Sequence, residues 1–397
     1  MPRTQRVRLS VGPVKRIHRP GPGRPEGQGR SDFLAIPALT WAGLSPRPGD
    51  PERRVALATR GPLGDTVVFD RQGGPLGAGP QDRLTGRPLQ IHRDWTGLPA
   101  GARGASVAMG NFDGIHLGHR AVIEAARQAA EAPLGVVTFE PHPRQFFAPD
   151  APPFRLMNAE SRANRLARLG TRHLFELPFG PVLAGLSPEA FAREVLVAGL
   201  GVCQVTVGAD FVFGKDRAGS VATLQDLGHR LGFGVTAVPL LGADGHSFSS
   251  TAIRQALAQG RPREAERMLG HLHRIEGEVI HGDKRGRQFG WPTANMRMDG
   301  LHLPRLGVYA VVVDVLTGPD RLSCQGVASL GVRPMFGRNA PNLEVHLFEF
   351  DGDLYGQHLS VGLVEFLRDE ARFDSVQALI DQIAADAQQA RAVLAGA

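Results

Sequence analysis

The sequence predicts two folded domains of different class: an α/β domain with a parallel sheet, then a small antiparallel β-barrel with a C-terminal helix. A chain of 397 residues is long enough for two or three domains. Short apolar strands alternate with helical patterns over residues 88–270, and strands of period two separated by turns follow from residue 271. We therefore expect one domain over 88–270 and a second over 271–397, joined near Gly270 to His273.

Residues 1–87 differ from the rest of the chain because they are rich in Gly, Pro and Arg. They hold 15 Lys and Arg against 7 Asp and Glu, so the basic excess of the whole chain, +6, belongs to this tail and the remainder is slightly acidic. Such a composition buries too little apolar surface to offset chain entropy, which predicts disorder with at most local pairing of 33–36 and 67–69. A nucleic-acid or partner-binding arm is the functional alternative, and an overextended gene start is another.

Composition excludes several classes of protein. Hydrophobic residues make up 42% and charged residues 21%, as in average globular proteins, and no run of about 18 apolar residues is long enough to span a bilayer. Two distant cysteines, Cys203 and Cys324, exclude a disulfide framework and a four-cysteine zinc site. The basic N-terminus has no apolar stretch behind it, so we expect no secretory signal and a cytoplasmic location.

The α/β domain is expected to bind its ligand where loops leave the C-terminal ends of parallel strands. Gly110 directly follows the first strand, which places the start of the site there. The pattern predicts strands at 106–109, 135–139, 173–177, 204–207 and 234–240, and helices at 118–131, 160–169, 188–197 and 224–231.

The second domain is expected to be a closed antiparallel barrel. The period-two segments predict strands at 275–280, 308–315, 325–330, 344–350 and 359–363, and the last helix is expected over 376–394.

A glycine-rich turn at residues 110–119, GNFDGIHLGH, leads from the first strand into a helix. Free backbone N–H groups and the positive end of a helix dipole suit a phosphate, and His116 and His119 add donors at the same place. Taken alone, the two histidines are ordinary polar residues or, with His142, part of a metal site.

A second cluster lies at residues 247–254, SFSSTAIR, near the end of the α/β domain. Its hydroxyls suit a helix N-cap, and Arg254 is expected in the first turn, facing the same way as the cap. The simplest interpretation is a capped helix.

Together the two clusters resemble the nucleotidylyltransferase superfamily, which pairs an early His-x-Gly-His with a late Ser/Thr and basic motif. Residues 138–143 (TFEPHP) and 208–219 (GADFVFGKDRAG) are similar to the flavin-side segments of the bacterial FMN adenylyltransferase module. That module is the N-terminal half of the bifunctional riboflavin kinase/FAD synthetase family, and the resemblance runs from about Leu89 to the end of the chain. It implies a Rossmann-like nucleotidylyltransferase domain followed by a riboflavin kinase barrel.

This resemblance also implies roles in the first site. The attacking FMN phosphate is already an anion, so positive donors and no catalytic base are expected. His116 and His119 would act on the α-phosphate and the departing pyrophosphate, and Arg254 on the β- and γ-phosphates. Ser249, Ser250 and Thr251 are expected to bind the phosphates. Gly110, Asn111 and Phe112 are expected at the nucleotide, and Asp210 and Phe211 near the flavin or ribose.

The barrel opens with a glycine-rich, basic segment that ends in Pro-Thr-Ala-Asn at 292–295. The glycine pattern alone is weak and also fits a flexible hairpin. The ending looks like the riboflavin kinase motif, in which Thr293 and Asn295 coordinate Mg²⁺ and ATP phosphates, and oxygen ligands suit this hard cation. The expected nucleotide-binding residues of the loop are Gly282, Gly286, Arg287 and Gly290.

Glu344 is the candidate catalytic carboxylate of the barrel. Period two places it on one face with His346 and Phe348, near the barrel interior or mouth. An alcohol must lose a proton as it attacks phosphorus, so the resemblance implies that Glu344 is the general base on the ribityl hydroxyl; the alternative is a rim glutamate in an ion pair. Residues 367–373, with Arg368, would cover the flavin.

In the barrel three residues depart from the family pattern, namely Trp291, Ser329 and Met335, so the riboflavin pocket is expected to differ in affinity more than in activity. The implied activity is phosphorylation of riboflavin to FMN with MgATP and adenylation of FMN to FAD with release of pyrophosphate, with no membrane or nucleic-acid partner. The alternatives are a single-activity nucleotidylyltransferase or flavokinase with the other module degenerate, and a nucleic-acid-binding protein with an inactive barrel. The oligomeric state stays open.

Overall fold

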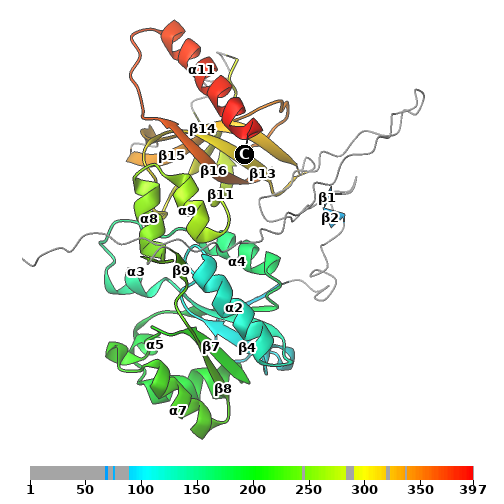
Figure 1. Ribbon diagram of the computed structural model, residues 1–397, viewed down its shortest axis with the longest axis vertical. Helices are drawn as coiled ribbons and strands as arrows, with labels where there is room; N and C mark the ends of the chain where they lie inside the picture. The colour runs from blue at the N-terminus through cyan, green and yellow to red at the C-terminus, as the bar shows by residue number, and fades with distance from the viewer. Residues whose placement is uncertain are drawn as a thin grey trace, which may run out of the picture. The chain divides into compact units, whose positions relative to one another are not determined.

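The computed structural model describes residues 89–243, 246–282, 290–318, 322–335 and 338–396, together with two short strands before them (Figure 1). These strands, β1 (Val68–Phe69) and β2 (Pro75–Leu76), pair antiparallel. The rest of the tail, including the expected pairing of 33–36, lies outside the described residues. So do two candidate loop residues, Gly286 and Arg287.

The first domain contains a six-stranded sheet in the order β3-β6-β5-β4-β7-β8, and every pair in it is parallel. This confirms the predicted sheet and adds an edge strand, β3, that the sequence pattern did not reveal because it is only three residues long. The strands are β3 (Gln90–His92), β4 (Ser106–Met109), β5 (Leu134–Glu140), β6 (His173–Pro178), β7 (Gln204–Gly208) and β8 (Gly234–Val238).

Helices and a short hairpin complete this domain. The expected helix at 188–197 is divided into a turn of α-helix and a π-helix, which ends at Gly201 in the left-handed conformation. The bounds are η1 (Ala100–Ala102), α2 (Leu117–Ala129), α3 (Pro143–Phe147), α4 (Ala159–Arg168), α5 (Pro181–Gly185), α6 (Pro188–Ala190), the π-helix η2 (Phe191–Leu200), η3 (Lys215–Arg217), α7 (Val221–Leu231), the hairpin β9 (Gly242–Ala243) and β10 (His246–Ser247), α8 (Ser250–Ala258) and α9 (Pro262–Leu269).

Strand β4 is the element that positions the first site. Val107 and Met109 pack in one apolar cluster with η2 and α7, whereas Ala108 packs in another with α2, α4, α8 and α9. Because both faces are covered, the whole strand is buried, and three of its four residues are apolar. Its neighbours are β5 and β7, so the C-terminal ends of the three strands open side by side at one edge of the sheet.

The second domain is a closed antiparallel barrel in the order β11-β12-β15-β14-β13-β16, as the sequence predicts. Strand β12 was not expected, since its residues stood out only as the end of a motif. The elements are β11 (His273–Ile280), β12 (Ala294–Arg297), β13 (Gly307–Val315), β14 (Ser323–Met335), β15 (Arg338–Leu347), β16 (His358–Arg368) and the helix α11 (Val376–Ala395).

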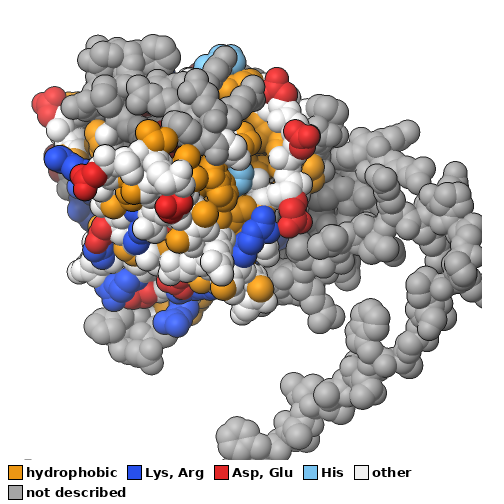
Figure 2. All heavy atoms as spheres, turned by 90° about the horizontal axis from the view of Figure 1, so that it is seen from above, with side chains coloured by type: hydrophobic (Ala, Val, Ile, Leu, Met, Phe, Trp, Pro, Cys, Tyr) orange, Lys and Arg blue, Asp and Glu red, His pale blue; other side chains and the backbone are white. Residues whose placement is uncertain are grey.

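Aliphatic side chains fill the barrel, among them Val311, Leu343 and Val345, all fully buried. A second cluster lies between the outside of the barrel and α11, and it includes Val308 and Phe348. Seen from the side of α11, hydrophobic side chains gather near the middle of the face, and side chains of both charge signs are interspersed around them (Figure 2).

Candidate functional site

The loop after β4 has a strained backbone held in place by packing. Phe112 and Ile115 have positive φ angles of 50° and 44°, and both side chains are almost completely buried in the core. A left-handed conformation is unfavourable for such residues, so it persists only where packing imposes it. Phe112, which we expected to contact the nucleotide, instead supports the loop from beneath, with its ring 5.2 Å from that of His119.

His116 and His119 form a stacked pair at the start of α2. Their ring centroids are 3.7 Å apart and the rings are inclined by 18°. His116 is the N-cap of the helix, and its Nδ1 accepts a hydrogen bond of 3.3 Å from the backbone N–H of His119. The Nδ1 atom of His119 is buried without a hydrogen-bond partner among the described residues.

Both rings are neutral at pH 7. Burial lowers the pKa of His116 to about 4, and burial together with the charge of His116 lowers the pKa of His119 well below its usual value. The two histidines therefore offer neutral N–H donors in this site, not the positive charge that we expected of them. An anion arriving beside them would raise both pKa values.

The second cluster lies beside the first. Ser249 caps α8 by accepting from the backbone N–H of Ala252, and the Ser250 hydroxyl donates to the carbonyl of Asp113 at 2.8 Å. Arg254 lies one turn further along α8 than expected, where its guanidinium bonds the Asp113 carboxylate at 3.0 Å and the Thr251 hydroxyl at 3.2 Å. Segments about 140 residues apart thus meet at one site.

Asp113 joins the two clusters, and sequence reasoning gave it no role. Its carboxylate also accepts from the backbone N–H groups of Leu156 at 2.7 Å and Met157 at 3.3 Å. Burial raises the pKa of Asp113, while the charges of Arg155 and Arg254 and these two N–H groups oppose the shift. The residue stands inside the quoted GNFDG motif, so its place in the site was visible in the sequence but its partners were not.

Two buried arginines extend this network along the same sheet edge. Arg155 bonds both carboxylate oxygens of Glu140, at 2.9 and 3.1 Å, and Arg162 bridges Glu140 and Glu176. Burial of Glu140 favours its neutral form, but its hydrogen bonds to the two arginines and their charges outweigh this and lower its pKa. No spacing of arginines along a chain predicts such burial, so sequence reasoning could not identify these two residues.

The remaining candidates of this domain lie around the same edge. Asn111 is exposed, and its carbonyl accepts from the Thr138 hydroxyl. Asp210 and Phe211 follow β7, where Asp210 is exposed and the Phe211 ring stacks on that of Phe213 at 5.8 Å. A further aromatic group is built from Phe139, Phe146, Phe147 and Phe179, whose ring centroids lie 5.1–5.7 Å apart.

The metal alternative that included His142 is not supported in the part of the chain that the structure describes. His142 caps α3, with its Nδ1 accepting from the backbone N–H of Arg144, and burial lowers its pKa to about 4. Among the described residues, no group of three or more His, Cys, Asp and Glu side chains could hold a metal ion.

The barrel brings the candidate magnesium ligand and the candidate base together. Asn295 on β12 pairs with Glu344 on β15, and Glu344 in turn pairs with Ser329 on β14. Asn295 is buried, and its Oδ1 accepts from the Asn342 amide at 2.9 Å. An amide oxygen keeps a second lone pair for a cation, and with the Thr293 hydroxyl this donor set fits Mg²⁺, which takes few protein oxygens and keeps waters and phosphates.

The absence of a side chain at Gly282 leaves room for the side-chain amide of Asn295. A Cβ atom there would lie 2.6–2.8 Å from the amide atoms of Asn295. Gly290 lies at the other end of the loop with φ 81°, a conformation that side chains rarely adopt.

Glu344 lies on the outer face of the barrel, which corrects our expectation of the interior or mouth. Leu343 and Val345 occupy the inside, so strand alternation turns Glu344 and His346 toward the outside of the barrel. His346 contacts Trp291 there edge to face at 4.9 Å, and its Nδ1 is 2.8 Å from the Pro292 carbonyl. The interior of this six-stranded barrel is filled by its own side chains.

Arg368 is held by a structural partner. Its guanidinium bonds both carboxylate oxygens of Asp386 on α11, at 2.8 and 2.6 Å, and lies 5.9 Å from the Phe373 ring centre. Such a bidentate pair fixes the end of β16 against α11.

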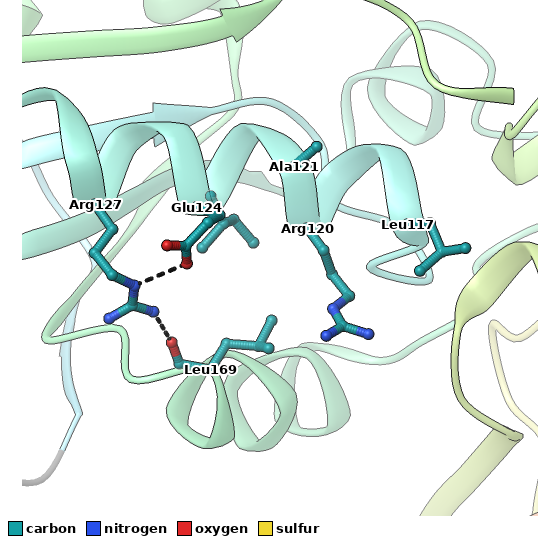
Figure 3. A pocket seen from close by; sticks show the side chains of 7 residues that line it. Leu117, Arg120, Ala121, Glu124, Arg127 and Leu169 are labelled. Atoms are coloured by element: carbon teal, nitrogen blue, oxygen red, sulfur yellow. Dashed lines mark hydrogen bonds and ion pairs between the residues drawn. The ribbon is translucent and has the colours of Figure 1, made fainter. Parts of the chain in front are cut away.

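A separate pocket lies between α2 and the end of α4 (Figure 3). Arg127 bridges it by bonding Glu124 and the Leu169 carbonyl, and Arg120 points into it. None of its lining residues is a predicted site residue. Within the described ranges, no helix is both long and apolar enough to cross a bilayer.

Fold and sites define a nucleotidylyltransferase-type α/β domain joined to a flavokinase-type barrel. Residues 98–252 match the model of the FAD synthetase family and residues 269–394 that of the riboflavin kinase family. A bifunctional riboflavin kinase/FMN adenylyltransferase of Pseudomonas fluorescens is 43% identical, covering 77% of this chain and 98% of the relative. The protein of the same description from Escherichia coli K12 is 39% identical, covering 72% and 92%. The chain belongs to the bifunctional riboflavin kinase/FMN adenylyltransferase family.

A solved structure agrees with the fold. A crystal structure described as a macrolide-efflux protein from Streptococcus pneumoniae is 31% identical, with a TM-score of 0.66, and covers 76% of this chain and 98% of that one. The similarity spans both domains.

Proposed function

We propose that the chain phosphorylates riboflavin to FMN with MgATP in its barrel and adenylates FMN to FAD with ATP in its α/β domain. The observation that carries this proposal is the meeting of two distant motifs, where Ser250 and Arg254 of α8 bond Asp113 in the loop that presents His116 and His119. An anion bound there would meet the N-termini of two helices and a guanidinium, which supports the proposal.

In adenylyl transfer, an oxygen of the FMN phosphate attacks the α-phosphorus of ATP, and the bond from that phosphorus to the bridging oxygen breaks to release pyrophosphate. The nucleophile carries no proton to remove, so the barrier is charge repulsion. We assign the N–H groups of His116 and His119 to the α-phosphate and leaving group. Arg254, Ser249, Ser250 and Thr251 hold the β- and γ-phosphates.

Other residues complete that site in our proposal. Gly110 and Asn111 line the nucleotide at the end of β4, with Phe112 supporting the loop beneath them. Asp210 and Phe211 contact the flavin or the ribose.

In riboflavin phosphorylation, the ribityl hydroxyl attacks the γ-phosphorus, gives its proton to Glu344, and ADP leaves. Mg²⁺, when bound, neutralises charge on the phosphate oxygens. Thr293 and Asn295 would hold it, and the expected nucleotide-binding residues of the loop would be Gly282, Gly286, Arg287 and Gly290. Trp291 and His346 border the flavin side, and Arg368 orders the segment that covers it.

We further propose domain boundaries at 88–270 and 271–397, with residues 1–87 dispensable for both reactions. A chain of residues 86–397 that lost either activity would show that this boundary is wrong. The reactions need only small-molecule substrates, and the two separated cysteines agree with a reducing cytoplasm.

A single incubation tests the function. Purified protein is given riboflavin and MgATP, and the flavins are separated by chromatography at successive times. FMN should appear first and FAD after it, and FMN given in place of riboflavin should yield FAD directly. FMN without FAD, or FAD only from added FMN, would identify a single-activity enzyme instead.

A further inference from the structure

The loop between β12 and β13 belongs to the barrel but contacts the α/β domain through its backbone. The N–H of His302 donates to the carbonyl of Arg155 at 2.8 Å, and the N–H of Arg305 donates to the carbonyl of Leu257 at 2.9 Å. Leu301 also forms a parallel bridge with Arg155. The loop is therefore fixed against two segments that line the adenylyl-transfer site.

The side chain of His302 contacts the residue that carries the positive charge of this site. Its Nε2 lies 2.9 Å from the carbonyl oxygen of Arg254. A carbonyl only accepts, so Nε2 carries the hydrogen. Burial lowers the pKa of His302, and the imidazole is neutral at pH 7.

Arg254 is thus held at both ends. Its guanidinium bonds Asp113 in the loop after β4, and its carbonyl accepts from His302 in the barrel. At the end of α8 the Leu257 carbonyl accepts from the N–H of Gly260 at 3.0 Å, and it accepts a second bond from the N–H of Arg305 in the same barrel loop. Helix α8 is therefore fixed at its start by the α/β domain and at its end by the barrel.

We propose that His302 is a positioning residue for adenylyl transfer, which it serves from the other domain by holding the turn of α8 that carries Arg254. This inference rests on the proposed role of Arg254. It makes FAD formation dependent on a barrel residue that touches neither nucleotide nor flavin. Phosphorylation of riboflavin does not use α8 and is independent of His302.

The test compares full-length variants in two assays, FAD formation from FMN and FMN formation from riboflavin. Loss of one neutral hydrogen bond corresponds to about a two- to twelvefold effect, so His302→Ala should lower kcat/KM of FAD formation by that factor. FMN formation should stay unchanged. His302→Gln, which keeps an N–H at the Nε2 position, should restore FAD formation.

His358→Ala is the matched control, because its Nδ1 lies 3.2 Å from Glu160 of α4 and so links the same two domains without touching α8. It should leave both activities unchanged, and its Tm should match that of His302→Ala. On an Arg254→Gln background, measured in single turnovers at high enzyme concentration, His302→Ala should have no further effect.

Three results would overturn the inference. His302→Ala could behave as His358→Ala does, both activities could fall together with Tm, or the His302 effect could persist on the Arg254→Gln background. If Arg254→Gln alone left FAD formation intact, the assignment of Arg254 itself would fail, which separates that error from this one.

Discussion

Asp113 and Arg254 show how much of an active site can depend on one buried ion pair. The exposed fraction of the Asp113 side chain is 4% and that of Arg254 is 16%, so neither charge is solvated well enough to stand alone. Each is also bonded to a second group of the site, Asp113 to backbone N–H groups and Arg254 to Thr251. The pair therefore fixes the two motifs against each other.

We expect His119 to act as a neutral hydrogen-bond donor in adenylyl transfer. His119→Ala removes a neutral N–H aimed at developing charge, which should lower FAD formation by about 10²- to 10³-fold and leave FMN formation unchanged. Because the pKa of His119 lies well below its usual value, the rate of the parent enzyme should not titrate with this residue between pH 6 and 8.

Stopped assays of both products at several pH values measure this, with the exposed His229→Ala as control. A fall in FMN formation, or a step near pH 6.5 that disappears in His119→Ala, would contradict the assignment.

A substitution at Glu344 distinguishes a catalytic role of this carboxylate from a structural one. Glu344→Gln keeps the shape and the hydrogen-bonding capacity but not the base, so riboflavin phosphorylation should drop by about 10²- to 10⁴-fold. Binding of MgATP and riboflavin should change little, and added FMN should still be converted to FAD. Initial rates of the two reactions and equilibrium binding measure these three quantities, and circular dichroism checks the fold. Formation of FMN at the parent rate by a normally folded variant would return Glu344 to an ion-pair role.

At the scale of elements, two rules position the site residues. Helices α2 and α8 begin with side-chain caps, His116 and Ser249, and both starts face the same strand end. In the barrel, antiparallel register places Asn295 opposite Glu344, and alternation turns Glu344 outward.

A substitution at Gly282, in the connection between β11 and β12, is expected to affect riboflavin phosphorylation but not the conversion of FMN to FAD. Gly282→Ala would place a Cβ within 2.6 Å of the Asn295 amide, and the amide would have to move away from the metal position. We expect a higher KM for MgATP in riboflavin phosphorylation, by about tenfold for 1.4 kcal/mol of lost binding, and unchanged conversion of FMN to FAD.

Gly277→Ala in β11 is the matched control, because its Cβ would meet only Met296 Cε at 3.7 Å. Equal KM values in the two variants would show that Asn295 does not hold the nucleotide's metal.

At the scale of the whole molecule, neutral buried histidines should make stability depend on pH. Burial lowers the pKa of His116 and His142 to about 4 and that of His273 to about 3. Unfolded histidines bind a proton near pH 6.5, so the unfolded state gains protons first and the free energy of unfolding falls as pH decreases from 6.5 toward 4. Asp113, with its raised pKa, opposes this trend.

Calorimetry at pH 7.5, 6.5, 5.5 and 4.5 should show Tm falling below pH 6.5. His142→Asn keeps an N-cap acceptor for α3 but does not titrate there, so its Tm should fall less steeply. A Tm that stays constant down to pH 4.5 would show that these histidines titrate normally in the folded protein.

The sequence by itself determined the order and class of the two domains, since periodicity and turn residues are local. The strands at 106–109 and 173–177 and the caps at Ser249 and the start of α2 lie where the pattern predicts them. The motif residues themselves were found through the family resemblance.

Only the tertiary structure decided which distant residues meet. Asp113 with Arg254, Asn295 with Asn342, and His302 with the Arg254 carbonyl are contacts of high sequence separation that no local pattern encodes. The ionisation of His116 and the outward face of Glu344 likewise depend on what surrounds them. Burial and neighbouring charge set a pKa, and packing on both sides of a strand decides which face is the inside.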